Sequence, residues 1–295
     1  MDAAAAPSTS AARGALAAAA RWRLPFSQQA WRGLAGNWLG AGTGSSLDFQ
    51  DHRVYVPGDD PRHIHWQAYA RTGLLTMKLY RAEVAPFVDI AIDTSPSMTC
   101  TPAKAARTDE LLAFCVASAD RAAAPVRIHA ACGRTLRVVA AEEVRAGRWR
   151  ERLPVTATLP AGVGAAPGPV PWRPGALKVL ISDLLFPGDP AAFLGPMAAG
   201  AGAAVVFSPA LADEAELPWR GNLELQDCET AVRRNQRIDA GLAARYHAAY
   251  ARHFDLWREA ARRRRVLFAR VSCEGELAVA LGGDAFTAGA VEAVN

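Results

Sequence analysis

The sequence predicts an α/β fold: an open, mostly parallel sheet flanked by helices, of the Rossmann-like kind. From residue 87 onward, short apolar runs alternate with helical patterns, an order typical of parallel strands joined by helices. The runs at 177–181 and 203–207 are apolar apart from Lys178, as expected of strands that are buried on both faces. A chain of 295 residues, half of them hydrophobic, is long enough to bury such a core.

The individual elements follow from local patterns. Strands are expected at residues 87–92, 126–131, 136–139, 177–181, 203–207, 223–225 and 266–271. Helices are expected at about residues 101–123, 142–153, 190–199 and 242–261. The first helix has Thr101 as its N-cap and Pro102 in its first turn, and the last has apolar residues at every third or fourth position. The Gly- and Pro-rich residues 159–175 are expected to form a long loop.

Composition divides the chain into three parts. Residues 1–25 are dominated by alanine and small polar residues and are expected to be a disordered tail. Residues 26–86 are rich in Trp, Arg, His, Asp and Gly and lack a long apolar run. We expect them to be a wrapping segment that packs on the core. Residues 87–285 form the predicted α/β domain.

Charge and cysteine content limit the class of protein. The net charge is only +4, so no general nucleic-acid-binding field is expected. The five cysteines are widely spaced and contain no CxxC pair, which favours reduced thiols in a reducing compartment. The alanine-rich start resembles neither a signal peptide nor a membrane span. We therefore expect a cytoplasmic protein without a membrane span.

Two predicted strands end in an aspartate, and this is where chemistry is expected. Asp93 and Asp183 each follow a buried run, and in open α/β sheets ligands lie beyond the carboxyl ends of the strands. Ser95 and Ser97 alternate after Asp93, so that all three side chains can face one side. Carboxylate and hydroxyl oxygens suit a hard cation, Mg²⁺ or Mn²⁺. The alternative is a turn and N-cap cluster without a metal.

The order Asp-x-Ser-x-Ser after a strand resembles the metal-ion-dependent adhesion site of von Willebrand factor A domains. Asp93, Ser95, Ser97 and Asp183 match that motif. The resemblance implies a further threonine from a middle loop, for which Thr156 and Thr158 are the candidates.

The segment before the first core strand resembles a bacterial family, domain of unknown function DUF58. The residues of this signature are Arg53, Tyr55, Gly58, Asp59, Arg62, Trp66 and Arg71. The resemblance implies a von Willebrand A-like fold, a MoxR-type AAA+ ATPase as partner, and no established enzyme activity. Physically, the arginines can pair with nearby aspartates while Trp66 anchors the segment on the sheet. Alternatively, the segment is a surface that recognises a binding partner beside the metal.

Three functions remain open. The first is a non-catalytic, metal-dependent protein-interaction module, in which an acidic protein ligand completes the metal's coordination and the chain acts as an assembly or maturation adaptor. The second is a metal-dependent phosphohydrolase with Asp93 as nucleophile, although Ser95 stands where such enzymes usually have a second aspartate. The third is a structural scaffold with a vestigial metal site. The sequence contains no phosphate-binding P-loop, GxGxxG, GxSxG or HExxH motif.

Overall fold

A six-stranded sheet forms the centre of the protein. The computed structural model describes residues 10–27, 33–57, 59–153 and 166–294. The sheet has the order β11-β8-β7-β4-β5-β6, with every pair parallel except the antiparallel pair β5–β6. Its strands are β4 (Val88–Asp93), β5 (Val126–Cys132), β6 (Thr135–Val139), β7 (Leu177–Ile181), β8 (Ala204–Ala210) and β11 (Leu267–Ser272). The predicted fold class is confirmed, and the strand order is that of doubly wound sheets.

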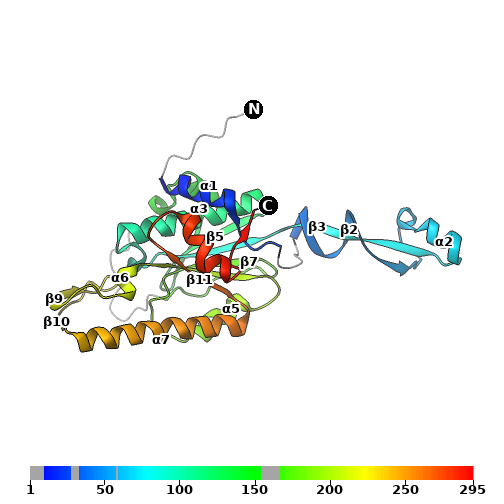
Figure 1. Ribbon diagram of the computed structural model, residues 1–295. Helices are drawn as coiled ribbons and strands as arrows, with labels where there is room; N and C mark the ends of the chain where they lie inside the picture. Colours follow the sequence, from blue (N-terminus) through cyan, green and yellow to red (C-terminus); the bar gives the residue numbers. More distant parts are fainter. Residues whose placement is uncertain (1–9, 28–32, 58, 154–165, 295) are drawn as a thin grey trace.

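Helices cover both faces of this sheet (Figure 1). One face carries α1 (Ser10–Arg21), α3 (Pro102–Arg121) and α8 (Leu277–Ala280), and the other carries α5 (Pro190–Ala198) and α7 (Ala240–Arg264). Strand residues alternate between the two layers, as the pleat requires: Ile90 and Ile92 join the apolar cluster under α1 and α3. Ala91 joins the cluster formed by α5 and α7, where Trp257 is fully buried.

The remaining elements connect or extend this core. They are β1 (Trp22–Arg23), η2 (Pro96–Thr99), α4 (Ala141–Arg145), η3 (Trp149–Arg152), α6 (Ala212–Ala215), β9 (Gly221–Gln226), β10 (Arg233–Ile238), the π-helical segment η4 (Leu281–Ala285) and β12 (Glu292–Ala293). The short strands β1 and β12 pair with each other, and β9 pairs with β10 in a hairpin outside the main sheet. The expected helix over 142–153 is interrupted at Gly147, whose φ of +71° is left-handed.

The prediction of a disordered tail over residues 1–25 is wrong from residue 10 onward, and residues 1–9 lie outside the described part of the chain. Residues 10–21 form α1, whose Ala15, Ala18 and Ala19 are buried against the core. Alanine side chains let the two helix backbones approach closely, so α1 can pack with little apolar bulk. Beyond the helix, the Leu24 amide donates a hydrogen bond to Ser118 Oγ of α3 at 2.7 Å. The α/β domain therefore includes residues on the amino-terminal side of its predicted boundary.

The predicted wrapping segment instead forms a projecting hairpin, called here the arm. It consists of β2 (Gly33–Val54) and β3 (Thr76–Pro86), which pair antiparallel, with η1 (Pro61–His63) and α2 (Trp66–Thr72) at its tip. Figure 1 shows the tip standing away from the α/β core. The two strands pair with each other along the arm, so the arm forms without joining the main sheet as a further strand.

The side chains at the tip correct the expected role of Trp66. It is 59% exposed and makes an edge-to-face contact with Tyr69 rather than anchoring the segment on the sheet. The apolar centre of the tip is formed by Ile64 and Met77, which are buried. The arm leaves the core at the amino end of β4, because β3 ends at Pro86 and β4 begins at Val88.

The other described signature residues lie at the tip, and the contacts that they make are within the tip itself. The Arg53 and Arg62 guanidinium groups each donate to a carboxylate at 2.6 Å, that of Asp59 and that of Asp60 respectively. Tyr55 is half-buried and donates its backbone N–H to Leu75 O. Arg71 is exposed. The predicted pairing of arginines with nearby aspartates is thus found at two places, and Gly58 lies outside the described residues.

Candidate functional site

The four predicted metal ligands gather at the carboxyl edge of the sheet. Strands β4 and β7 are parallel neighbours with Ile92 opposite Ile181, so the residues that follow them lie side by side. Ser182 Oγ accordingly donates to Asp93 Oδ2 at 2.7 Å. The side chains of Asp93, Ser95, Ser97 and Asp183 are all buried. The arm leaves from the opposite edge of the sheet, so the idea that it reads a partner beside this site is not supported.

Local hydrogen bonds fix the turn after β4. The Ser95 amide donates to Asp93 Oδ1 at 2.9 Å, which is the Asx-turn expected of an aspartate two residues before an amide. Pro96 then begins η2, whose Met98 accepts a weak hydrogen bond at Sδ from the Asp183 amide at 3.2 Å. These contacts fasten the Asp-x-Ser-x-Ser loop to the residues that follow β7.

The two serine hydroxyls lie close together. Ser95 Oγ and Ser97 Oγ are 3.1 Å apart. Two oxygens at adjacent corners of an octahedron around Mg²⁺, each at about 2.0–2.1 Å, would be roughly 2.9 Å apart. The spacing of the hydroxyls therefore fits neighbouring ligands of a small hard cation.

Asp93 lies in an electrostatically unfavourable place. Burial and the nearby charge of Asp183 raise its pKa to about 7, against the opposing effect of hydrogen bonds from Ser95 and Ser182. A raised pKa means that the carboxylate lacks enough positive charge around it. A cation beside Asp93 would supply that charge.

A second acidic side chain reaches the loop from the β9–β10 hairpin. Glu229 Oε1 accepts a hydrogen bond from the Ser97 amide at 3.1 Å. Its other oxygen, Oε2, is buried and has no hydrogen-bond partner among the described residues. An orphaned carboxylate oxygen beside the Ser95–Ser97 pair again points to missing positive charge or a missing donor.

A buried lysine, which the sequence analysis did not single out, supplies the one cation found in direct contact with these carboxylates within the described part of the chain. Lys104 Nζ lies 2.6 Å from Asp183 Oδ2 and 2.6 Å from Glu214 Oε1. Its side chain is 1% exposed. Burial alone would lower the pKa of Lys104, but the charges of Asp183 and Glu214 raise it above its ordinary value. The ammonium group thus stays charged and neutralises the Asp183 side of the site.

The donor set is compatible with a hard cation and depends on hydroxyls. Within the described ranges, no group of three or more His, Cys, Asp or Glu side chains is placed to hold a metal ion. A cation would therefore need Ser95 and Ser97 together with Asp93, and Asp183 would have to share its carboxylate with Lys104. Thr156 and Thr158, the candidates for a further ligand, lie outside the described residues.

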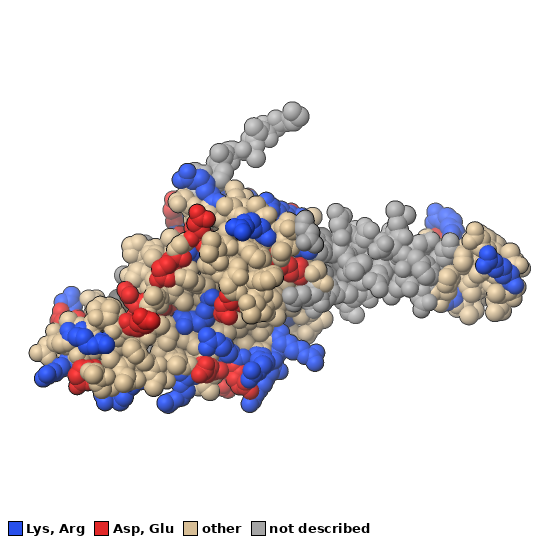
Figure 2. All heavy atoms as spheres, in the orientation of Figure 1, with Lys and Arg blue, Asp and Glu red and all other residues tan. Residues whose placement is uncertain are grey.

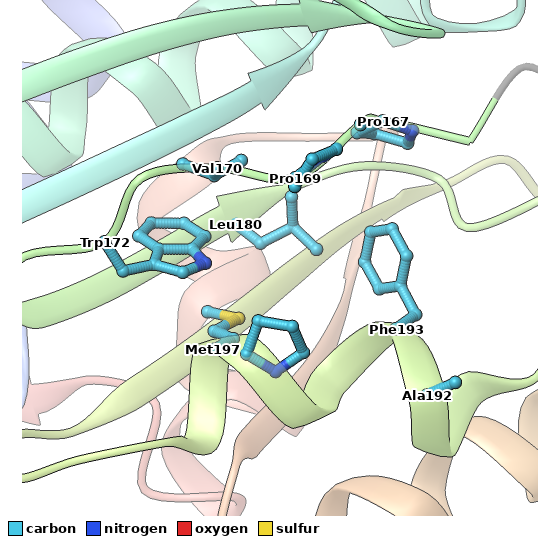
Figure 3. A pocket seen from close by; sticks show the side chains of 10 residues that line it. Pro167, Pro169, Val170, Trp172, Leu180, Ala192, Phe193 and Met197 are labelled. Atoms are coloured by element: carbon cyan, nitrogen blue, oxygen red, sulfur yellow. The ribbon is translucent and has the colours of Figure 1, made fainter.

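A separate hollow of about 200 Å³ lies between α5 and the segment before β7. Figure 3 shows Trp172, Leu180, Phe193 and Met197 around it. The described residues of its wall include no ionisable side chain, so they offer shape and apolar surface but no group for acid–base or metal chemistry. The acidic edge of the sheet remains the candidate site.

Comparisons with known proteins bear on the signature. Residues 51–148 match the family described as "Protein of unknown function DUF58". The resemblance to DUF58 is confirmed. The DUF58 match spans the tip of the arm and the Asp-x-Ser-x-Ser loop, while Asp183 lies beyond it.

Figure 2 shows acidic and basic side chains interspersed over the core, consistent with 33 Lys and Arg against 29 Asp and Glu in the chain.

Similar proteins have no described activity. Uncharacterized protein Rv1480 of Mycobacterium tuberculosis (strain H37Rv) and uncharacterized protein Mb1516 of Mycobacterium bovis are each 28% identical over 240 residues, which cover 75% of this chain and 73% of the relative. Among solved structures, the conserved hypothetical protein BatB from Bacteroides thetaiotaomicron matches at 13% identity with a TM-score of 0.37, covering 69% of this chain and 98% of BatB. No described helix combines the length and apolar character that crossing a bilayer requires.

Proposed function

We propose that this chain is a non-catalytic module that binds a protein partner through a divalent cation. Asp93, Ser95, Ser97 and Asp183 would hold the cation, Mg²⁺ or Mn²⁺. The observation that carries the proposal is the convergence of these side chains, with the two serine hydroxyls 3.1 Å apart. When bound, the cation would attract a carboxylate of the partner. Asp93 and Asp183 would supply the negative charge that retains the cation, and the hydroxyls would supply neutral ligands.

The burial of Asp93 favours binding over catalysis. Its Oδ1 accepts from the Ser95 amide and its Oδ2 from Ser182 Oγ, and the residue is 1% exposed. A nucleophilic carboxylate must reach the atom that it attacks. The phosphohydrolase alternative therefore has less support here than a role for Asp93 as an anchor.

The partner is proposed from the DUF58 resemblance alone. That resemblance favours a MoxR-type AAA+ ATPase, for which this chain would act as an assembly or maturation adaptor. The contact chemistry that we propose is an acidic side chain of the partner at the cation. Copurification of the chain with a MoxR-type ATPase should then be lost in excess chelator, and an Asp93→Ala variant should fail to copurify even with Mg²⁺ present. If copurification is unaffected by chelator and by Asp93→Ala, the cation-mediated contact is refuted.

Cation binding itself is tested by titration calorimetry with Mg²⁺ and Mn²⁺. We expect wild type to bind one cation, and Asp93→Ala and Ser95→Ala to lose most of that affinity. Ser118→Ala is the matched control, because Ser118 is also a buried serine with a hydrogen bond but lies on α3 against α1. Equal affinity in wild type and Asp93→Ala, or an absence of binding in wild type, would contradict the proposal.

A further inference from the structure

Lys104 occupies a position inside the site, and a bound cation would have to compete with it. It lies in the first turn of α3, after the N-cap Thr101, and its side chain reaches across to the residues after β7. The ammonium group touches two carboxylates that belong to different elements, Asp183 after β7 and Glu214 in α6. Both distances are 2.6 Å, short enough for charge-assisted hydrogen bonds.

We propose that Lys104 is a built-in competitor of the divalent cation, and that cation binding transfers its ammonium group from Asp183 to Glu214 alone. The inference rests on the proposed function and deepens it. Without a cation, Lys104 neutralises Asp183 and keeps the edge of the sheet folded. With a cation, the positive charge on Asp183 comes from the metal, and Lys104 is withdrawn.

Glu214 makes this exchange physically feasible. A buried ammonium group that lost every partner would be strongly destabilising. Lys104, however, would retain its ion pair with Glu214 when its ion pair with Asp183 is broken. Glu214 is itself held in place: its Oε2 accepts from the Leu211 amide at 3.2 Å, and its backbone oxygen accepts from the Tyr246 hydroxyl at 2.6 Å. It therefore remains a fixed acceptor in both states.

The opposite side of the site is open to a cation in a way that the Lys104 side is not. Asp93 Oδ1 accepts from the Ser95 amide, and the two serine hydroxyls hydrogen-bond to each other. None of these three side chains has a cationic partner among the described residues. Glu229 adds a buried oxygen without a partner among the described residues. A cation can thus meet Asp93, Ser95 and Ser97 first and compete with Lys104 only for Asp183.

The test is a variant that removes Lys104 without changing the net charge of the cluster. In Lys104→Gln/Glu214→Gln, one positive and one negative charge are lost together. If Lys104 competes for Asp183, Mg²⁺ affinity measured by calorimetry should rise on the order of tenfold or more. If only net charge matters, affinity should stay the same. The control is Arg107→Gln/Glu110→Gln, which removes a partly buried ion pair of α3, at 2.9 Å, and should leave Mg²⁺ affinity unchanged.

Wild-type protein gives a second readout that does not depend on the folding of a variant. The sequence contains three lysines, Lys78, Lys104 and Lys178, so side-chain NMR of ¹⁵N-labelled lysine is simple to assign with a Lys104→Arg sample. Saturation with Mg²⁺ should shift the Lys104 ammonium signal and leave that of Lys178 in place.

The outcomes separate the inference from the function on which it rests. Wild-type Mg²⁺ binding with equal affinity in the double variant, or with an unmoved Lys104 signal, would overturn the competitor role and leave the cation-dependent function standing. Binding that appears only in the double variant would support the competitor role and contradict a cation-dependent function of the native chain. No binding in any variant would refute both.

Discussion

The ion pair between Arg173 and Asp89 should be costly to break by removing a single partner. Asp89 is completely buried near the amino end of β4. It accepts hydrogen bonds from Arg173 Nε and from the Arg173 amide, both at 2.6 Å. The guanidinium group also donates to Val88 O and Pro125 O and lies 4.5 Å from the centre of the Phe87 ring. An Arg173→Met variant therefore leaves a buried carboxylate without the guanidinium group that is hydrogen-bonded to it.

The expected loss can be bounded from both sides. Removing one partner of a buried ion pair typically costs about 3–5 kcal/mol. The variant can limit this cost by protonating the carboxylate, which for an ordinary aspartate with a pKa of ~3.9 costs about 4 kcal/mol at pH 7 and about 1.5 kcal/mol at pH 5. We therefore expect Arg173→Met to lower the free energy of unfolding by about 3–4 kcal/mol at pH 7 and by distinctly less at pH 5.

Urea denaturation with excess chelator, followed by circular dichroism, measures this loss without interference from the proposed cation site, which lies at the other edge of the sheet. Arg145→Met is the control, because the Arg145–Asp120 pair is exposed on both sides and should contribute less than about 1 kcal/mol. Adding Asp89→Asn to Arg173→Met should restore part of the stability, since it removes the unpaired charge. A loss below about 1 kcal/mol at pH 7, or one that is independent of pH, would refute the reasoning.

Three further predictions concern the site, the arm and the first helix. Because the pKa of Asp93 is about 7 in the folded protein, the folded state keeps a proton that the unfolded chain has lost. In chelator, the free energy of unfolding should fall as pH rises from about 4 to 7, and an Asp93→Asn variant should show a shallower slope in urea titrations. Trp66→Ala at the exposed tip should change stability by less than about 0.5 kcal/mol, whereas Trp257→Ala in the core should cost about 3–5 kcal/mol; similar losses would mean that the tip is docked on another part of the chain. Ala18→Leu should cost about 1–3 kcal/mol by overpacking the contact of α1 with the core, while the same change at exposed Ala17 should be nearly neutral in thermal unfolding, and equal effects would rule out the packing of α1.

The core sheet could be predicted because its signal is local and redundant. The segments Val88–Asp93 and Leu177–Ile181 are apolar at most positions, and all of their residues are buried. Each ends at the polar residues of the site. Once the strands are parallel, the edge on which Asp93 and Asp183 fall follows from chain direction alone. What composition could not supply was strand order, and therefore that β4 and β7 are direct neighbours.

The arm and α1 were missed for the opposite reason, because their hydrophobic patterns are weak within any short stretch of sequence. In α1, the buried face consists of alanines, so a hydrophobic stripe is hard to distinguish from low complexity. In the arm, β2 and β3 have irregular register, with bulges between Ala35 and Trp38 and between Leu39 and Thr43. Such bulges break the alternation by which strands are recognised. Trp66 was predicted to anchor the segment on the sheet from its residue type alone, and residue type does not determine burial.

Lys104 illustrates the limit of motif reading at the site itself. In the sequence it is an ordinary basic residue in the first turn of a helix, a place where the helix dipole does not favour a cation. Only the fold shows that its ammonium group is 2.6 Å from Asp183, which is 79 residues away in the chain. A motif specifies which oxygens can hold a cation, but the affinity of the site depends on every charge that shares those oxygens. The four matched residues therefore predict a location for a cation, whereas under the proposal above its affinity would depend on whether the metal or Lys104 neutralises Asp183.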